Sequence, residues 1–107
     1  GVLIMGSGNM VHNLRMVAWD KLNEPEYGYD WANEINQTFK EKILSHSHND
    51  LMNYEKLGSA AKLAIPTPDH YFPLIYTLGL QGKDDEVNFF NDKAVGGSLT
   101  MTSVKFG

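Results

Sequence analysis

Hydrophobic residues recur every four positions in the second quarter of the chain, which predicts an amphipathic helix. The apolar positions are Trp31, Ile35, Phe39 and Ile43. Asn, Glu, Gln and Lys fill the positions between them, so that the opposite face of the helix is polar. Asp30 stands just before the first apolar position, where a side-chain oxygen can cap the free amides of a helix start. We therefore expect a helix that Asp30 caps and whose apolar face enters the core.

Shorter helices are expected in the middle of the chain. Ser47, with Asp50 three residues later, forms a short-armed capping box for a helix that ends at Gly58, and residues 59–63 add one more turn. Residues 66–70 resemble a helix entrance, in which Thr67 caps and Pro68 takes the first helical position.

Pro73 affects where this last helix can begin. An interior proline loses a hydrogen bond and collides with the preceding turn. We therefore expect the regular helix to begin near Pro73 and to end at Leu78, before Gly79. In either case His70 lies in or just before a first turn.

Three segments are expected to form strands. Residues 2–5 are a continuous apolar run closed by Gly6-Ser7-Gly8, which is typical of a strand covered on both faces. Residues 86–91 and 98–106 also have strand character, and in the second Val104 and Phe106 share one face. Strands and helices together predict an α/β protein.

Composition narrows the class of protein further. The formal net charge is −4 and the nine Lys and Arg residues are scattered, so nucleic acid is not an expected partner. The absence of cysteine excludes disulfides and thiolate metal sites and fits the cytoplasm. No apolar run is long enough to span a membrane. The 107 residues suit one domain at most, and the opening inside a predicted strand leads us to expect a fragment.

Two of the four histidines occupy positions where sites are common. His12 follows a glycine-rich turn at the end of a predicted strand, the edge where open α/β sheets bind ligands. His70 stands at a predicted helix entrance. By sequence position alone, each is more simply explained as a hydrogen-bonded histidine at an element end, without a function. His46 and His48 lie between two predicted helices with no third ligand nearby, so we expect a solvated loop there.

The same two histidine neighbourhoods resemble signatures of the class III extradiol ring-cleavage dioxygenases, in the branch of the DOPA extradiol dioxygenases. Residues 6–15, Gly-Ser-Gly-Asn-Met-Val-His-Asn-Leu-Arg, are similar to the first signature. Residues 66–74, Pro-Thr-Pro-Asp-His-Tyr-Phe-Pro-Leu, are similar to the second, and residues 98–106 to the closing strand. The order and the separation agree, with His12 and His70 58 positions apart.

The resemblance implies a fold and a site. It implies a mixed central sheet flanked by helices, with residues 1–107 as the C-terminal part of a single catalytic domain. His70 would bind the catalytic metal, which is Fe(II) in the active enzyme and often Zn(II) in the isolated one. His12 would face the same pocket as an acid and base or as a further ligand, and Ser7 and Asn9 would help to hold the substrate. The family's two other metal histidines lie in its N-terminal half, which no segment here matches.

The resemblance also implies an activity, namely opening the ring of a catechol such as DOPA with O2. The missing N-terminal half of the same protein would then be needed, and the fragment alone is expected to be inactive. One alternative is a metal-binding or partner-binding module that keeps the fold without turnover. A second is a structural fragment whose histidines are packed and bind no metal.

Overall fold

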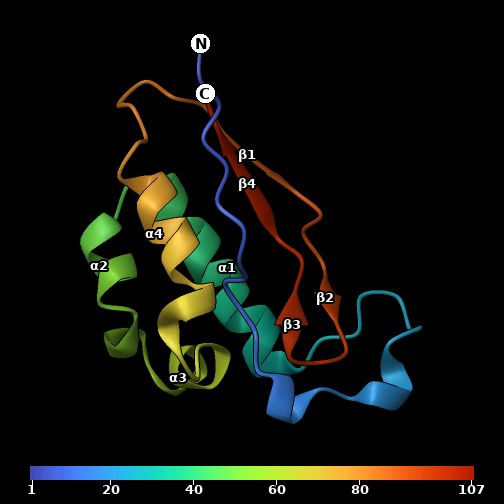
Figure 1. The fold of residues 1–107 in the computed structure, drawn as a ribbon. Helices are drawn as coiled ribbons and strands as arrows, with labels where there is room; N and C mark the ends of the chain where they lie inside the picture. The colour runs from blue at the N-terminus through green and yellow to red at the C-terminus, as the bar shows by residue number, and fades with distance from the viewer.

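Helix α1 (Asp30–Leu44) forms the centre of the core (Figure 1). The structure is a computed structural model and describes all 107 residues. Ile35, Phe39 and Ile43 are buried, as their spacing predicted. The predicted cap is wrong, because Asp30 is the first helical residue and Tyr29 occupies the cap position without a side-chain bond. The carboxylate of Asp30 still lies in the first turn, where a negative charge is favourable.

The chain then descends through three short helical segments. They are α2 (His48–Met52), the 3-10 helix η3 (Tyr54–Leu57) and α3 (Ser59–Ala64). The single helix expected up to Gly58 is wrong, because α2 ends at Met52. The next residue, Asn53, takes the C-cap position, and its side-chain amide donates to the Asn49 carbonyl at 2.8 Å. The capping box is also wrong, because Ser47 makes no capping bond and Asp50 pairs with Lys42 at 2.8 Å.

The predicted helix entrance near His70 consists of two elements. They are the 3-10 helix η4 (Pro68–His70) and helix α4 (Phe72–Leu78). Pro73 lies in the first turn of α4, where no hydrogen bond is lost, so the start predicted there is confirmed. The Thr67 cap is wrong, since its side chain makes no capping bond. Tyr71, between the two elements, is buried and its hydroxyl donates to the Leu51 carbonyl at 2.8 Å.

Four short strands form two antiparallel pairs. The pairs are β1 (Val87–Phe90) with β4 (Ser103–Phe106), and β2 (Ala94–Val95) with β3 (Leu99–Thr100). The strands predicted over residues 86–91 and 98–106 are confirmed, except that the second is interrupted at residues 101–102. Val104 and Phe106 pack against the core, as the alternation predicted. The helices lie on one side of these strands (Figure 1), so the predicted combination of helices and sheet is confirmed.

The strand predicted over residues 2–5 is wrong for this structure. These residues pair with no other strand, and Val2, Leu3 and Met5 are more than 80% exposed. An apolar sequence favours a strand only where a neighbouring strand can satisfy its amides and carbonyls. The N-terminal segment meets a strand only later, where His12 and Leu99 form an antiparallel bridge.

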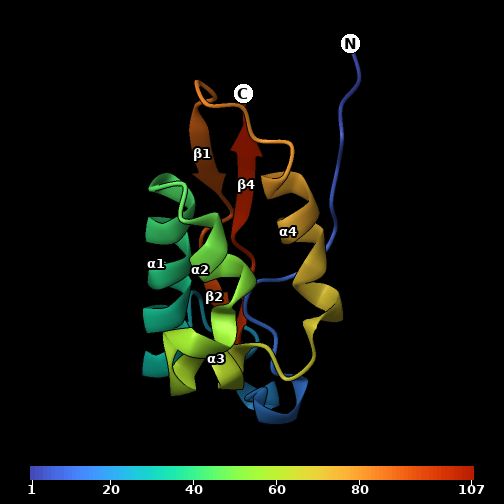
Figure 2. The ribbon, with the colours of Figure 1, turned by 90° about the vertical axis from the view of Figure 1, so that its left-hand side faces the viewer.

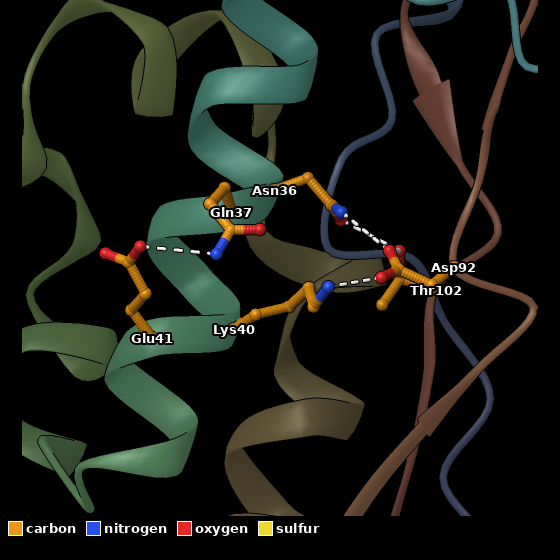
Figure 3. A network of polar contacts seen from close by, with 6 residues as sticks. All are labelled: Asn36, Gln37, Lys40, Glu41, Asp92 and Thr102. Atoms are coloured by element: carbon orange, nitrogen blue, oxygen red, sulfur yellow. Dashed lines mark hydrogen bonds and ion pairs between the residues drawn. The ribbon is translucent and has the colours of Figure 1, made fainter.

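A polar network joins α1 to the strands (Figure 3). Asp92, which follows β1, accepts hydrogen bonds from Asn36 at 3.0 Å and Thr102 at 3.0 Å and forms an ion pair with Lys40. Burial acts to raise the pKa of Asp92, but the bonds from Lys40, Asn36 and Thr102 together lower it below its usual range. The ionised carboxylate therefore holds α1 against the sheet.

Replacing Asp92 by Asn is expected to lower the free energy of unfolding by about 1–2 kcal/mol at pH 7, because hydrogen bonds to an ionised partner are lost. The pKa of Asp92 is lower in the folded chain than in the unfolded one. Its contribution is therefore present above the unfolded pKa of about 4 and is lost as the pH falls through the folded pKa. Urea unfolding at pH 7 and pH 2.5 measures both. Asp84→Asn, at an exposed position, is the control, and an equal deficit at both pH values would contradict this role of the charge.

Candidate functional site

The structure brings His12 and His70 together although they lie 58 positions apart in the sequence. Their ring centroids are 4.9 Å apart and the ring planes are inclined at 49°. His12 lies on the N-terminal segment and His70 ends the 3-10 helix η4. The two signature histidines are therefore neighbours in the fold rather than isolated residues at two element ends.

Main-chain bonds on both sides fix the position of His12. Its amide donates to the Ala64 carbonyl at the end of α3 at 2.8 Å. On the other side, His12 forms an antiparallel β-bridge with Leu99 of β3. The next residue, Asn13, adds a side-chain bond to the Leu63 carbonyl at 2.8 Å. The His12 side chain is consequently buried between α3 and β3, with the whole residue 8% exposed.

Both ring nitrogens of His12 face main-chain carbonyl oxygens. Nδ1 lies 3.1 Å from the carbonyl oxygen of Asn9, and Nε2 lies 3.1 Å from that of Thr67. A neutral imidazole carries one N–H and can donate to only one of the two, whereas the protonated ring can donate to both. Burial lowers the pKa of His12 and outweighs the two carbonyls, which raise it, and nearby His70 lowers it further. The ring is therefore neutral at pH 7, with one nitrogen free to accept a proton.

His70 is the open member of the pair. Its side chain is 56% exposed, and Nδ1 lies 3.5 Å from the carboxylate of Asp69, whose pKa is lowered chiefly by the side chain of Thr67. The ring's Nε2 makes no hydrogen bond within the chain. Buried Tyr71 follows immediately and fixes the backbone here, so an exposed ring is attached to a rigid support.

The glycine-rich turn lies directly against the backbone of His70. The amide of Asn9 donates to the His70 carbonyl at 2.8 Å. A Cβ atom placed on Gly8 would overlap that same carbonyl oxygen, and one on Gly6 would come within 2.9 Å of the Pro73 carbonyl oxygen. Glycine is therefore required because two backbones touch, a reason that the sequence alone did not reveal.

The two predicted substrate-binding residues differ in how much of their side chain is available. Ser7 is exposed and its hydroxyl makes no hydrogen bond within the chain. The Asn9 amide group donates to the Thr100 carbonyl at 2.9 Å, which ties the turn to β3. The side-chain oxygen of Asn9 and the second N–H of its amide group are left for a ligand.

The second histidine pair is more ordered than the solvated loop expected for it. The rings of His46 and His48 stack with centroids 5.9 Å apart, and Gln81, far along the chain, bridges them. Gln81 Oε1 lies 2.9 Å from His48 Nε2, and its side-chain nitrogen lies 3.3 Å from His46 Nε2. The sequence did not indicate that Gln81 contacts these histidines, because the contact depends on how α4 packs beside α2. One nitrogen of each ring is therefore paired with Gln81.

A groove of about 740 Å³ opens beside the histidine pair. His70 and Asn9 lie at its wall, and its other walls are the N-terminal residues 2–6, helix α4 and strand β4. Apolar side chains make up half of the residues that line it. The exposed ring of His70 is thus accessible from a groove wide enough for a small molecule.

The donor atoms present fit part of a metal site. Two imidazoles side by side are suitable ligands for Fe(II) or Zn(II). A protein metal site needs about three or more ligands, and the chain contains no group of three His, Cys, Asp or Glu side chains able to hold a metal. These residues therefore fit the metal as one part of its ligand set.

No helix in the chain has the length and the apolarity to cross a lipid bilayer.

No protein-family model matches the chain. A protein of Escherichia coli (strain K12) named 4,5-DOPA dioxygenase extradiol is 34% identical over 110 residues, which cover all of this chain and 39% of that protein. A protein of the same name from Portulaca grandiflora is 30% identical over 111 residues, covering 99% of this chain and 38% of its own length.

The structural comparison agrees with these sequence relatives. The crystal structure of an uncharacterised Escherichia coli K12 protein matches with a TM-score of 0.82 and 35% identity, over 94% of this chain and 41% of that one. The chain thus spans about two fifths of the length of the relatives it matches. By sequence and by fold, it resembles the C-terminal part of the extradiol ring-cleavage dioxygenases of the DOPA branch.

Proposed function

We propose that the complete protein is a non-haem metal-dependent extradiol dioxygenase that opens the ring of a catechol such as DOPA with O2. The observation that carries the proposal is the contact between the two signature histidines, whose ring centroids are 4.9 Å apart. The names of the relatives support the same reaction class. Because the chain spans about two fifths of those relatives, the activity is proposed for the complete protein only.

The metal in this proposal is Fe(II) in the active enzyme, with Zn(II) as a substitute in isolated protein. His70 is the ligand from this chain, since its ring is exposed and Nε2 is free. The remaining ligands come from the N-terminal half of the same protein, because no third suitable side chain lies near the pair. When bound, such a metal would supply the Lewis-acid and redox chemistry that the reaction of a catechol with O2 requires.

His12 is the acid and base in this proposal. Its lowered pKa leaves the ring neutral at pH 7, so that a ring nitrogen can take a proton from a catechol hydroxyl as the substrate binds. In this proposal Nδ1–H donates to the Asn9 carbonyl and Nε2 is the proton acceptor. Once protonated, Nε2 can donate to the Thr67 carbonyl, which stabilises the cation until the proton is returned during ring opening.

The substrate is expected to lie between the histidine pair and the glycine-rich turn. Ser7 offers a free hydroxyl and Asn9 a free side-chain oxygen, so both can form hydrogen bonds to the substrate. The apolar wall of the adjoining groove suits the face of an aromatic ring. These contacts orient the ring. The bond that opens joins one of the two hydroxyl-bearing carbons to the adjacent carbon that bears no hydroxyl.

A second candidate is a metal-binding or partner-binding module with the same fold and no turnover. It is favoured by one observation, which is that this chain supplies only part of a ligand set. The two candidates differ in whether O2 is consumed when both metal and catechol are present.

Oxygen uptake by the complete protein separates the two candidates. Protein loaded anaerobically with Fe(II) is mixed with L-DOPA and with several other catechols, and a ring-opened semialdehyde is followed by absorbance. Uptake that depends on both Fe(II) and catechol, with stoichiometric product, is the expected result. The same protein loaded with Zn(II), which has no redox chemistry, is the control. Retention of metal without O2 consumption for any catechol would favour the module.

A further inference from the structure

The second histidine pair directs the same nitrogen of each ring to a single amide group. Gln81 Oε1 lies 2.9 Å from His48 Nε2, and the side-chain nitrogen of Gln81 lies 3.3 Å from His46 Nε2. The two rings are nearly parallel, with planes inclined at 14° and centroids 5.9 Å apart. Two imidazole nitrogens and one amide oxygen therefore converge on the same small region.

Three separate elements bring these side chains together. His46 follows α1, His48 is the first residue of α2, and Gln81 follows α4. The turn from α1 to α2 and the end of α4 lie at the same end of the helical layer (Figures 1 and 2). His70 precedes α4 whereas Gln81 follows it. The cluster is therefore separate from the His12–His70 pair, at the opposite end of this helix.

The backbone at His46 is in the left-handed region, with φ of 55°. The residue ends α1 in a Schellman motif, in which the Ser47 amide donates to the Lys42 carbonyl at 2.9 Å. The His46 amide donates to the Ile43 carbonyl at 3.2 Å. Glycine is the usual residue at this position, because a Cβ atom is unfavourable there. An imidazole at this position lies beside the His48 ring, so the strained residue is one that brings the two rings together.

A cation can reach this cluster and is favoured there. His46 is exposed and His48 and Gln81 are half-buried, so solvent has access to the cluster. The carbonyl end of the 15-residue helix α1 carries a partial negative charge, which favours a cation close to it. Lys42, the basic residue in the last turn of α1, pairs with Asp50 at 2.8 Å, which offsets its positive charge.

We propose that His46, His48 and Gln81 form a second metal site, which binds Zn(II) through the two Nε2 atoms and Oε1. Imidazole is a suitable ligand for Zn(II), and water can occupy the fourth position. With Zn–N distances of about 2.0–2.1 Å, two imidazoles on one tetrahedral ion have centroids roughly 5–6 Å apart, in agreement with the separation here. The third ligand is an amide oxygen, so the site needs no third His, Cys, Asp or Glu side chain.

Binding of the ion requires two small rearrangements. The Gln81 oxygen faces His48 Nε2, which therefore carries the ring proton, whereas the Gln81 NH2 group faces the lone pair of His46 Nε2. The His48 proton must move to Nδ1, which leaves the ring neutral. The Gln81 oxygen must turn towards the ion about the last side-chain torsion, which is broad for glutamine. The bound ion then links the turn between α1 and α2 to the end of α4.

Equilibrium dialysis of the complete protein over a range of free Zn(II) tests the site without measuring activity. The wild type is expected to bind one zinc per chain that His46→Asn binds only at about 100-fold or more higher free zinc, since a ligand is lost. Asparagine accepts the left-handed backbone, so the turn is retained. Ser47→Ala, which keeps both rings, is the control and is expected to bind zinc as the wild type does. Equal zinc binding by the wild type and His46→Asn would overturn the proposal.

Two changes at Gln81 separate a metal ligand from a residue that only forms hydrogen bonds. Gln81→Glu replaces the amide oxygen by a charged carboxylate and is expected to lower the free zinc at half-saturation by about 10-fold or more. Gln81→Leu removes the oxygen and is expected to raise it. A gain in affinity does not arise from a variant that is merely misfolded. Unchanged affinity in both variants would exclude Gln81 as the third ligand and overturn the proposal.

Discussion

Replacing His70 by Ala in the complete protein is expected to abolish both metal retention and ring opening while leaving the fold intact. The side chain is 56% exposed and makes only a long contact with Asp69, so its removal leaves no buried cavity. A lost ligand is expected to weaken metal binding by about 100-fold or more, since even the partners of ligands contribute 10–100-fold. Metal content after gel filtration, catechol-dependent O2 uptake and circular dichroism provide the three readouts. Full metal content in the His70→Ala protein would contradict its role as a ligand.

The matched variant is His12→Gln, which keeps a polar side chain at a buried position. If His12 moves protons, the rate of ring opening is expected to fall by about 10²–10⁴-fold while most of the metal is retained. Equal metal loss in the two variants would make His12 a second ligand instead. The comparison therefore decides between the two roles that the sequence resemblance leaves open.

Replacing Phe39 by Ala is expected to lower the free energy of unfolding by about 3–5 kcal/mol, because a fully buried aromatic side chain leaves a cavity. Phe39 lies at 0% exposure in α1, and its ring centroid is 5.6 Å from that of Tyr71. Tyr71 adjoins His70, so the same change would loosen the support of the exposed ring. Urea unfolding measures the loss, and Phe72→Ala, at a position 47% exposed, is the control. Equal losses in both variants would contradict the central place of Phe39.

Local patterns along the chain were sufficient to predict the elements whose stability is mostly local. The four-residue spacing of Ile35, Phe39 and Ile43 predicted α1 and its buried face, and the alternation at Val104 and Phe106 predicted the inward face of β4. Pro73 predicted the start of α4, because a proline tolerates only the first turn. Each of these depends on residues close together in the chain.

Caps and helix ends were predicted less well, because competing partners come from elsewhere. Asp50 was expected to cap α2 but pairs with Lys42 of α1, and Ser47 makes no capping bond. Residues 2–5 have the composition of a buried strand, yet a strand needs a partner that local sequence does not supply. In each case, the group that determines the local structure lies outside the segment whose sequence gave the prediction.

For the candidate site, the sequence identified the histidines and the tertiary structure determined what surrounds them. His12 and His70 stand in recognisable segments, so their importance could be inferred without coordinates. Only the folded chain shows the Thr67 and Asn9 carbonyls at the His12 nitrogens and the contact that requires glycine at position 8. Main-chain oxygens are the same in every residue, and so the sequence carries no mark of where folding will place them.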